Sequence, residues 1–225
     1  MKYIVKPIEN SDTKEWLLKK HYLKRMTSIS FAFGLFDETK LIGVCTFGNA
    51  IPLNMKRSIC GKDYESIVYE LNRLCIDEDA IKNAASYFIG QCFKQLPKPL
   101  IIVSYADKSM GHHGYIYQAT NFLFLGQSHT QMDWKVKGLE HLHSRTLMDQ
   151  FAFESNRIDK LKEKYGDRMY QVMREAKNKY VFFLGSKTQT KQMKAQLIKK
   201  PLPYPKGDNQ NYDATYKPII QFKLL

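Results

Sequence analysis

The spacing of apolar and polar residues along the chain predicts a mixture of strands and helices. Period-two alternation and short apolar runs bounded by turn residues predict strands over 3–8, 30–36, 40–47, 69–76, 100–103, 122–126 and 179–184. Apolar residues at helical spacing predict helices over 13–22, 84–96, 115–119, 153–165 and 186–200. Three further segments are expected to be a polar loop (51–63), an extended stretch (134–146) and an edge strand (219–225).

This order of elements predicts an α/β (α+β) fold with a mixed central sheet and helices on its faces. The chain has 225 residues, 44% of them hydrophobic, which is enough for one substantial core. Residues 1–150 are expected to form that core. Residues 151–225 are expected to be a basic C-terminal part packed on the same domain.

The positive charge of the chain is concentrated near its end. The net charge is +13, yet residues 1–154 hold 19 Lys and Arg against 16 Asp and Glu, while residues 155–225 hold 16 against 6. Such an asymmetry favours binding to a polyanion, and the interleaved tyrosines favour nucleic acid because rings stack on unpaired bases. The residues expected to bind are Lys187, Lys191, Lys194, Lys199 and Lys200. A merely solvated basic surface would show the same composition.

Bulk composition argues against a membrane protein and a secreted one. The apolar runs are only a few residues long, too short for a membrane span, and the first residues lack the apolar core of a secretory signal. We therefore expect a cytoplasmic protein. The cysteines lack the paired spacing of zinc and redox sites and are expected to be buried small hydrophobes: Cys45, Cys60, Cys75 and Cys92.

The densest group of polar and ionisable residues follows the apolar run 100–103. The stretch Ser104–Phe122 contains Ser104, Tyr105, Asp107, Lys108, His112, His113, Tyr115 and Tyr117. Open α/β sheets place their chemistry beyond the carboxyl ends of strands, so this stretch is the candidate site. A hydrated loop whose histidines lie in water is the alternative, and spacing alone names no reaction.

The order of elements is similar to that of acyltransferases of the GNAT type. That resemblance implies two central parallel strands, here 69–76 and 100–105, that splay apart and hold an acyl donor. It also implies a glycine-rich loop after the first strand, which binds the pyrophosphate of acetyl-coenzyme A through backbone N–H groups. The chain has Asp77-Glu-Asp-Ala-Ile-Lys-Asn83 there, with three carboxylates and no glycine. Acetyl-coenzyme A is therefore not expected to be the donor.

Several blocks, in the same order, resemble the phage Mom family of DNA modification proteins. These are His21-Tyr22, Gly43–Gly48, Glu70–Leu74, Ser104–Asp107, Gly111–Asn121, Lys179–Gly185 and Leu202–Lys206. The resemblance implies a GNAT-like fold and a transferase that converts the N6 amino group of adenine in DNA to an N6-carbamoylmethyl group. It also implies that this change shields phage DNA from host restriction enzymes.

The resemblance also implies roles for individual residues. Asp107 is the first choice for a catalytic role, as base or metal ligand, and the other catalytic candidates are His21, Tyr22, Ser104, His112 and Tyr117. The candidates for binding substrate or donor are Asn72, Arg73, Tyr105 and Asn121, although Arg73 could equally pair with Glu70. Iron is a candidate cofactor, held by His21 and Asp107 with a tyrosine.

The chemistry of the adenine amino group adds two expectations. Its lone pair is delocalised into the ring, so a positioned base and an activated donor are needed. The atom is also hidden in a duplex, so we expect base flipping, with Tyr22 or Tyr117 holding the adenine. The product carries a glycinamide unit, and some branches of the GNAT fold take aminoacyl groups from tRNA. Glycyl-tRNA is therefore the candidate donor.

Two other functions remain open from the sequence. One is a GNAT-type N-acetyltransferase acting on a nucleic acid or a basic peptide. The other is a nucleic-acid-binding module without enzymatic activity, in which Asp107 and His112 are structural.

Overall fold

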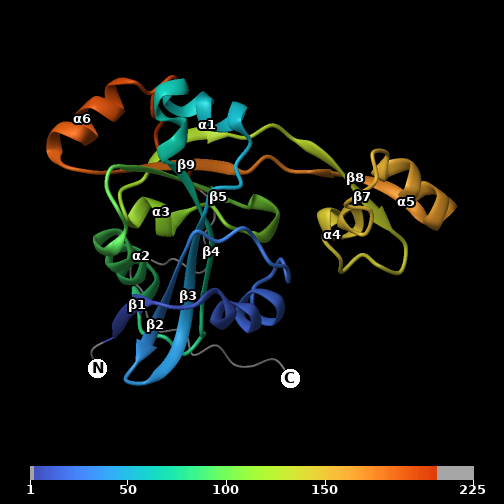
Figure 1. Cartoon of the computed structure of the whole chain (residues 1–225), viewed down its shortest axis with the longest axis horizontal. Helices are drawn as coiled ribbons and strands as arrows, with labels where there is room; N and C mark the ends of the chain where they lie inside the picture. The colour runs from blue at the N-terminus through green and yellow to red at the C-terminus, as the bar shows by residue number, and fades with distance from the viewer. Residues whose placement is uncertain (1–2, 207–225) are drawn as a thin grey trace.

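A computed structural model describes residues 3–206 and shows a seven-stranded sheet at the centre (Figure 1). The strand expected over 219–225 lies outside the described residues. The sheet order is β1-β2-β3-β4-β5-β9-β6. Its strands are β1 (Ile4–Pro7), β2 (Phe31–Asp37), β3 (Lys40–Gly48), β4 (Val68–Ile76), β5 (Leu100–Ala106), β6 (Leu123–Gln127) and β9 (Asn178–Leu184). These match the strands predicted between residues 3 and 184, and the mixed α/β class is confirmed.

The middle of the sheet opens between β4 and β5. The two strands run parallel and pair only at their starts, where Val68, Tyr69 and Glu70 face Ile101, Ile102 and Val103. Beyond that point β4 stays paired with β3 as far as Ile76, and β5 stays paired with β9 as far as Ala106. Each strand therefore follows its other neighbour, and the two diverge. The splay expected for this pair is confirmed.

Helices cover both faces of the sheet. On one face, α2 (Ala84–Gln95) and α3 (Tyr115–Ala119) join a core that includes Phe88, Phe93 and Phe122. On the other, α1 (Leu53–Cys60) and α6 (Lys187–Ala195) bury Ile59, Cys60 and Met193 against the sheet. Neighbouring residues of β5 alternate between these two cores, as a central strand requires. Among the described residues, no helix is long and apolar enough to cross a membrane.

Three predicted segments differ from the structure. The stretch 134–146, expected to be extended, is a strand only as far as Val136 and ends in the first turn of the helix α4 (Ser144–Asp149). The expected loop 51–63 contains α1, because Ile59 and Cys60 occur together on the side of a short helix that faces the sheet. The expected helix 13–22 is shorter and irregular, with a 3₁₀ turn η1 (Asn10–Thr13) followed by a π-helical segment η2 (Trp16–Lys20). The helix thus ends one residue before His21, whose backbone is extended.

Residues 128–177 form an arm that leaves the sheet between β6 and β9 and projects to one side (Figure 1). It contains β7 (Gln131–Val136), α4 (Ser144–Asp149), α5 (Arg157–Tyr165) and β8 (Met169–Arg174). Its own small core is built on Val136, Leu147 and Leu161. The arm has a narrow neck, where Ser128 N–H donates to Lys177 O (2.8 Å) and Lys177 N–H donates to Ser128 Oγ (2.9 Å).

The predicted division at residue 150 falls inside this arm. Residues on the C-terminal side of that point complete the arm and then return to the sheet as β9, an inner strand between β5 and β6. The basic C-terminal third thus supplies part of the main core, including the fully buried Tyr180 and Val181.

Candidate active site

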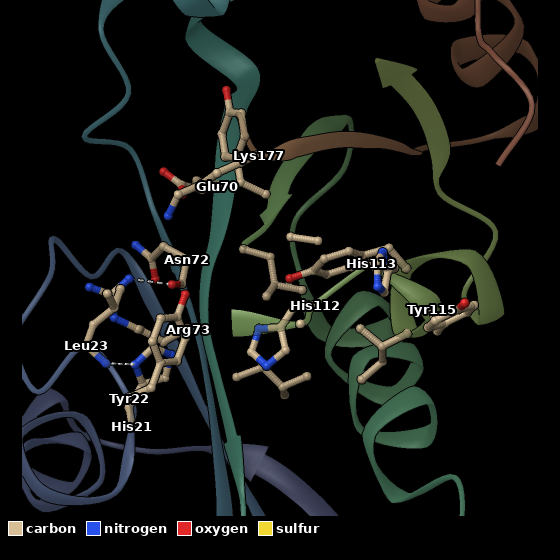
Figure 2. Close-up of a pocket in the computed structure, with 18 residues that line it drawn as sticks. His21, Tyr22, Leu23, Glu70, Asn72, Arg73, His112, His113, Tyr115 and Lys177 are labelled. Carbon is tan, nitrogen blue, oxygen red and sulfur yellow. Dashed lines mark hydrogen bonds between the residues drawn. The ribbon is translucent and has the colours of Figure 1, made fainter. Parts of the chain in front are cut away.

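A cavity of about 380 Å³ occupies the opening between β4 and β5 (Figure 2). β4 contributes residues 70–74 to its wall, and β5 contributes Tyr105 and Ala106. The rest of the wall comes from residues 21–23, from residues 111–117 and from Lys177 at the neck of the arm. The structure thus joins the predicted stretch after β5 with the distant pair His21 and Tyr22.

Three aromatic rings meet at this cavity. The rings of His21 and Tyr22 stack with centroids 4.5 Å apart, and the rings of His112 and Tyr22 lie nearly perpendicular, with centroids 5.6 Å apart. Nδ1 of His21 accepts the backbone N–H of Leu23 (3.1 Å), which places the proton of the neutral ring on Nε2. Burial, with Arg73 and His112 nearby, lowers the pKa of His21 to about 4. Burial likewise lowers the pKa of His112. The two imidazoles are therefore neutral near pH 7.

Asp107 lies beside the cavity and contacts a residue that lines it. Its side chain is buried, with Oδ2 accepting from Lys177 Nζ (2.6 Å) and Oδ1 accepting from the hydroxyl of Ser109 (2.6 Å). Burial raises the pKa of Asp107, but the hydrogen bonds from Lys177 and Ser109 outweigh it and lower the pKa overall. The carboxylate thus holds the Lys177 ammonium at the cavity wall.

Three other polar groups of the wall have few protein partners. Arg73 Nε and Tyr105 Oη are buried, and neither has a hydrogen-bond partner among the described residues. Arg73 Nη1 donates to the carbonyl of Asn72 (2.6 Å), and the described residues include no direct ion pair between Arg73 and Glu70. Burial raises the pKa of Glu70, against the opposing influence of Arg73 and Lys177. Unpaired buried polar atoms beside a cavity are positions where water or a polar ligand can supply the missing hydrogen bonds.

Two predicted catalytic residues, Ser104 and Tyr117, form contacts that stabilise the opening between β4 and β5. Ser104 Oγ donates to the carbonyl of Leu71 on β4 (2.9 Å), so it ties the two diverging strands together. Ser104 also lies near the hydroxyl of Tyr117 and lowers its pKa, but burial outweighs this effect and raises the pKa of Tyr117 overall. The Tyr117 ring lines the cavity but also packs against Phe122 at 5.2 Å. These contacts hold Tyr117 in place, whereas Tyr22 is 38% exposed.

The predicted binding residues do not all gather at the cavity. Tyr105 and Arg73 line it, and Asn72 lines it with an amide that is already bonded to Thr46 (2.6 Å) and to the carbonyl of Ser28 (2.9 Å). Asn121 does not line the cavity and forms a turn with φ +61° after α3. The lysines of the C-terminal region, on α6 and just beyond it, are exposed and do not line the cavity either: Lys187, Lys191, Lys194, Lys199 and Lys200.

The residues proposed for iron already form hydrogen bonds within the protein. Both oxygens of Asp107 accept hydrogen bonds from the protein, and so does Nδ1 of His21. Within residues 3–206, no three His, Cys, Asp or Glu side chains come together closely enough to hold a metal ion. We therefore assign no catalytic step to a metal.

Sequence reasoning missed two residues of the wall. The sequence suggests Glu70 only as a partner for Arg73, although its place in β4, two residues before Asn72, puts it at the start of the splay. Lys177 follows the arm and has no motif around it. Only the return of the chain from the arm into β9 brings Lys177 next to Asp107.

Comparison with known proteins identifies the family. The methylcarbamoylase Mom of Escherichia phage Mu is 32% identical over 133 residues, which are 57% of this chain and 54% of that protein. The chain therefore matches about half the length of this relative.

Solved structures with a similar arrangement include two acetyltransferases. One is an N-acetyltransferase from Staphylococcus aureus Mu50 (12% identity, TM-score 0.43, covering 82% of this chain and 99% of that one). The other is the ribosomal-protein-S5-alanine acetyltransferase from Vibrio fischeri (13% identity, TM-score 0.43, covering 82% and 94%). The model of the Mom protein family matches residues 2–206, and the chain belongs to that family.

Proposed function

We propose that this protein is a transferase that converts the N6 amino group of adenine in DNA to an N6-carbamoylmethyl group. The observation that carries the proposal is the cavity in the β4–β5 splay, which combines an aromatic group, a buried carboxyl and cationic side chains. Membership of the Mom family and the name of the phage Mu relative support it. Mass spectrometry of nucleosides from cells that express the protein tests it, because absence of the modified adenine contradicts it.

The aromatic group is suited to hold an extruded base. Tyr22 lines the cavity, with the His21 ring stacked on it and the His112 ring nearly perpendicular to it, so two neighbouring rings fix its orientation. Adenine can stack on such a ring once it has left the duplex. Of the two tyrosines expected to hold the base, Tyr22 is the more exposed, and we propose it for this role. Tyr22→Ala should raise KM for DNA, while Tyr22→Phe should keep KM near the original value.

Glu70 is the carboxyl that we propose as the general base. It lines the cavity, and burial raises its pKa, which makes its carboxylate a stronger base than an exposed one. Asp107, the first choice from the sequence, has a lowered pKa and both oxygens occupied, so we propose that it positions Lys177. Loss of a general base lowers kcat by about 10²- to 10⁴-fold.

The variants Glu70→Gln and Asp107→Asn separate these two roles. Glu70→Gln should lower kcat by such a factor and remove the rise of kcat with pH that its ionisation causes. Asp107→Asn should keep that pH dependence with a reduced kcat. The reverse pattern, with the pH dependence lost only in Asp107→Asn, would identify Asp107 as the base.

We propose glycyl-tRNA as the donor. Attack of N6 on the glycyl ester would release the tRNA 3′ hydroxyl and form an N6-glycyl amide, which is an isomer of the carbamoylmethyl product. A rearrangement then completes the conversion. It breaks the bond from N6 to the carbonyl carbon and the bond from the methylene carbon to the amino nitrogen, and it forms the bond from N6 to the methylene carbon and the bond from the carbonyl carbon to that nitrogen. Two bonds are exchanged for two, so no further reagent is needed. The segment 77–83 supports a donor other than acetyl-coenzyme A, because Asp77 is a carboxylate paired with Lys20 (2.6 Å) where the pyrophosphate would bind.

Reconstitution with purified components tests the donor. Protein, DNA and glycyl-tRNA labelled in the glycyl group should yield labelled adenine, and mass-spectrometric fragmentation should separate the two isomers. Acetyl-coenzyme A in place of the tRNA should give no product. If glycyl-tRNA also gives none, while DNA from expressing cells does carry the modification, another donor is in use. Resistance of that DNA to restriction enzymes tests the protective role.

A further inference from the structure

A second hollow adjoins the cavity and lies between the sheet and the arm. Its volume is about 550 Å³, and it shares Leu23, Glu70, Asn72 and Arg73 with the cavity as a common wall. We call it the arginine groove, because five arginines line it: Arg25, Arg73, Arg145, Arg157 and Arg174. Three of these belong to the arm, so the groove exists only because the arm folds next to the loop that follows η2.

The groove carries uncompensated positive charge. Two of its arginines are already paired with carboxylates, Arg25 with Asp149 (3.2 Å) and Arg174 with Asp133 (3.5 Å). Among the described residues, Arg73, Arg145 and Arg157 form no ion pair. Apart from Asp133 and Asp149, the only carboxyl among the described residues that line the groove is Glu70. Glu70 contributes at most one negative charge against these three guanidinium groups. Three guanidinium groups are thus available to an anion.

We propose that the arginine groove binds the phosphodiester backbone of the DNA strand whose adenine enters the cavity. This inference rests on the proposed function. An extruded base stays attached through its sugar to phosphates a few bonds away, so base and backbone must lie in adjoining hollows. Arg73 stands in the wall between the two hollows with a buried, unpartnered Nε. Guanidinium groups bind phosphate oxygens through paired hydrogen bonds.

The position of the groove favours DNA over tRNA as its occupant. The lysines of α6 form a separate basic surface at the opposite end of the molecule from the arm (Figure 1), and they line neither hollow. A donor tRNA can bind at a distance and reach the cavity with its unpaired 3′ end. The strand that carries the target base has no such freedom, because its phosphates enter with the base.

Single substitutions in the groove provide the test. Arg145 is exposed, and its side chain makes no hydrogen bond with the described residues, so Arg145→Gln removes charge without removing a structural contact. Arg157→Gln is the second variant, although Arg157 also donates to the carbonyl of Ala152 (2.8 Å). Lys137→Gln is the control, because Lys137 is an exposed cation of the same arm that does not line the groove.

Binding of duplex DNA is measured by fluorescence anisotropy across a salt series, without any donor. We expect each groove variant to bind about tenfold more weakly, which is the effect of removing one charge-assisted hydrogen bond. The slope of log K against log salt should become shallower by about 0.7–0.9 for each phosphate that the variant no longer binds. The Lys137→Gln control should show the original affinity and slope, and circular dichroism should show the original fold in all three variants.

Two results would overturn the inference. One is unchanged DNA affinity and salt slope in both groove variants. The other is weaker binding of tRNA in these variants with unchanged binding of DNA, which would assign the groove to the donor. Weaker DNA binding in the variants, together with a wild-type protein that forms no modified adenine, would retain the groove and reject the proposed function.

Discussion

Replacing Lys177 by Met tests whether the ion pair at the neck of the arm holds the candidate site together. The substitution keeps most of the apolar stem and removes the ammonium that contacts Asp107 at 2.6 Å. The side chain of Asp107 is only 6% exposed and that of Lys177 is 22% exposed. The variant therefore leaves a buried carboxylate whose remaining protein donors, in the described part of the chain, come from Ser109.

The free energy of unfolding that Lys177→Met is expected to lose lies between the values for buried and exposed ion pairs. Removing one partner of a fully buried ion pair costs about 3–5 kcal/mol, whereas exposed pairs contribute about 0–1 kcal/mol. Lys177 is partly exposed and Ser109 still donates to Asp107, so we expect about 2–3 kcal/mol of unfolding free energy to be lost near pH 7. Lys20→Met is the matched control, because its pair with Asp77 has the same 2.6 Å distance but side chains 43% and 25% exposed. It should lose about 0.5 kcal/mol.

The pH dependence of this loss follows from the sign of the pKa shift. With Lys177 present, the pKa of Asp107 is lowered, so the carboxylate stabilises the fold above its unfolded pKa of about 4 and stops doing so as pH falls through the folded pKa. Without Lys177, burial raises the pKa of Asp107, and the carboxyl protonates more readily in the folded protein. The difference between the two proteins should therefore shrink as pH falls below about 4.

Urea unfolding is measured for the original protein, for Lys177→Met, for Asp107→Asn and for the double variant Asp107→Asn/Lys177→Met. These four free energies of unfolding give the coupling energy between Asp107 and Lys177 directly. The reasoning is wrong if Lys177→Met loses less than about 0.5 kcal/mol near pH 7, the value of an exposed pair. It is also wrong if the loss is the same at all pH values, because the ionisation of Asp107 would then not be involved.

Three further predictions concern other parts of the chain. Gly114→Ala should lower the free energy of unfolding by about 2–4 kcal/mol, measured by thermal denaturation, because φ is +94° and the new Cβ would lie 2.3 Å from a tyrosine ring. Gly111→Ala, with φ +70° in open space, should lower it by about 1 kcal/mol. Burial lowers the pKa of His21 to about 4, so the stability that the neutral ring contributes should be complete above about pH 6.5 and be lost as pH falls toward 4. His21→Gln should therefore make the free energy of urea unfolding less dependent on pH in that window. Replacing Lys191 and Lys194 together by Gln should weaken nucleic-acid binding in a sequence-independent way and reduce the salt slope by up to about 2, as measured by anisotropy.

The sheet could be predicted from the sequence because each strand carries its own signal. Runs such as Leu100–Val103 and Val181–Leu184 are apolar on both faces, which marks inner strands regardless of what they pair with. The divergence of β4 and β5 followed from the order of the elements and their likeness to a known arrangement. The helix α1 could not be predicted in this way, since its apolar face consists of few residues and gains its stability from the sheet beneath it.

The candidate site was predicted only where its residues are close in the sequence or belong to a recognisable block. His112 and Tyr117 lie in one stretch, and the His21-Tyr22 pair resembles a family block. Lys177 and the arginines of the groove depend on the path of the arm, and no local period reveals that a lysine after a fifty-residue excursion returns to a buried aspartate. Long-range contacts of this kind are set by topology.

The neck of the arm has a consequence for how such proteins can diversify. Gln127 and Asn178 are register partners on β6 and β9, so the chain leaves and re-enters the sheet at adjacent points. An insertion between two such points can be lengthened, replaced or lost with little change to the strands that carry it. An exchange of residues 131–174 would therefore change the arginine groove while the strands on either side of the β4–β5 cavity keep their positions.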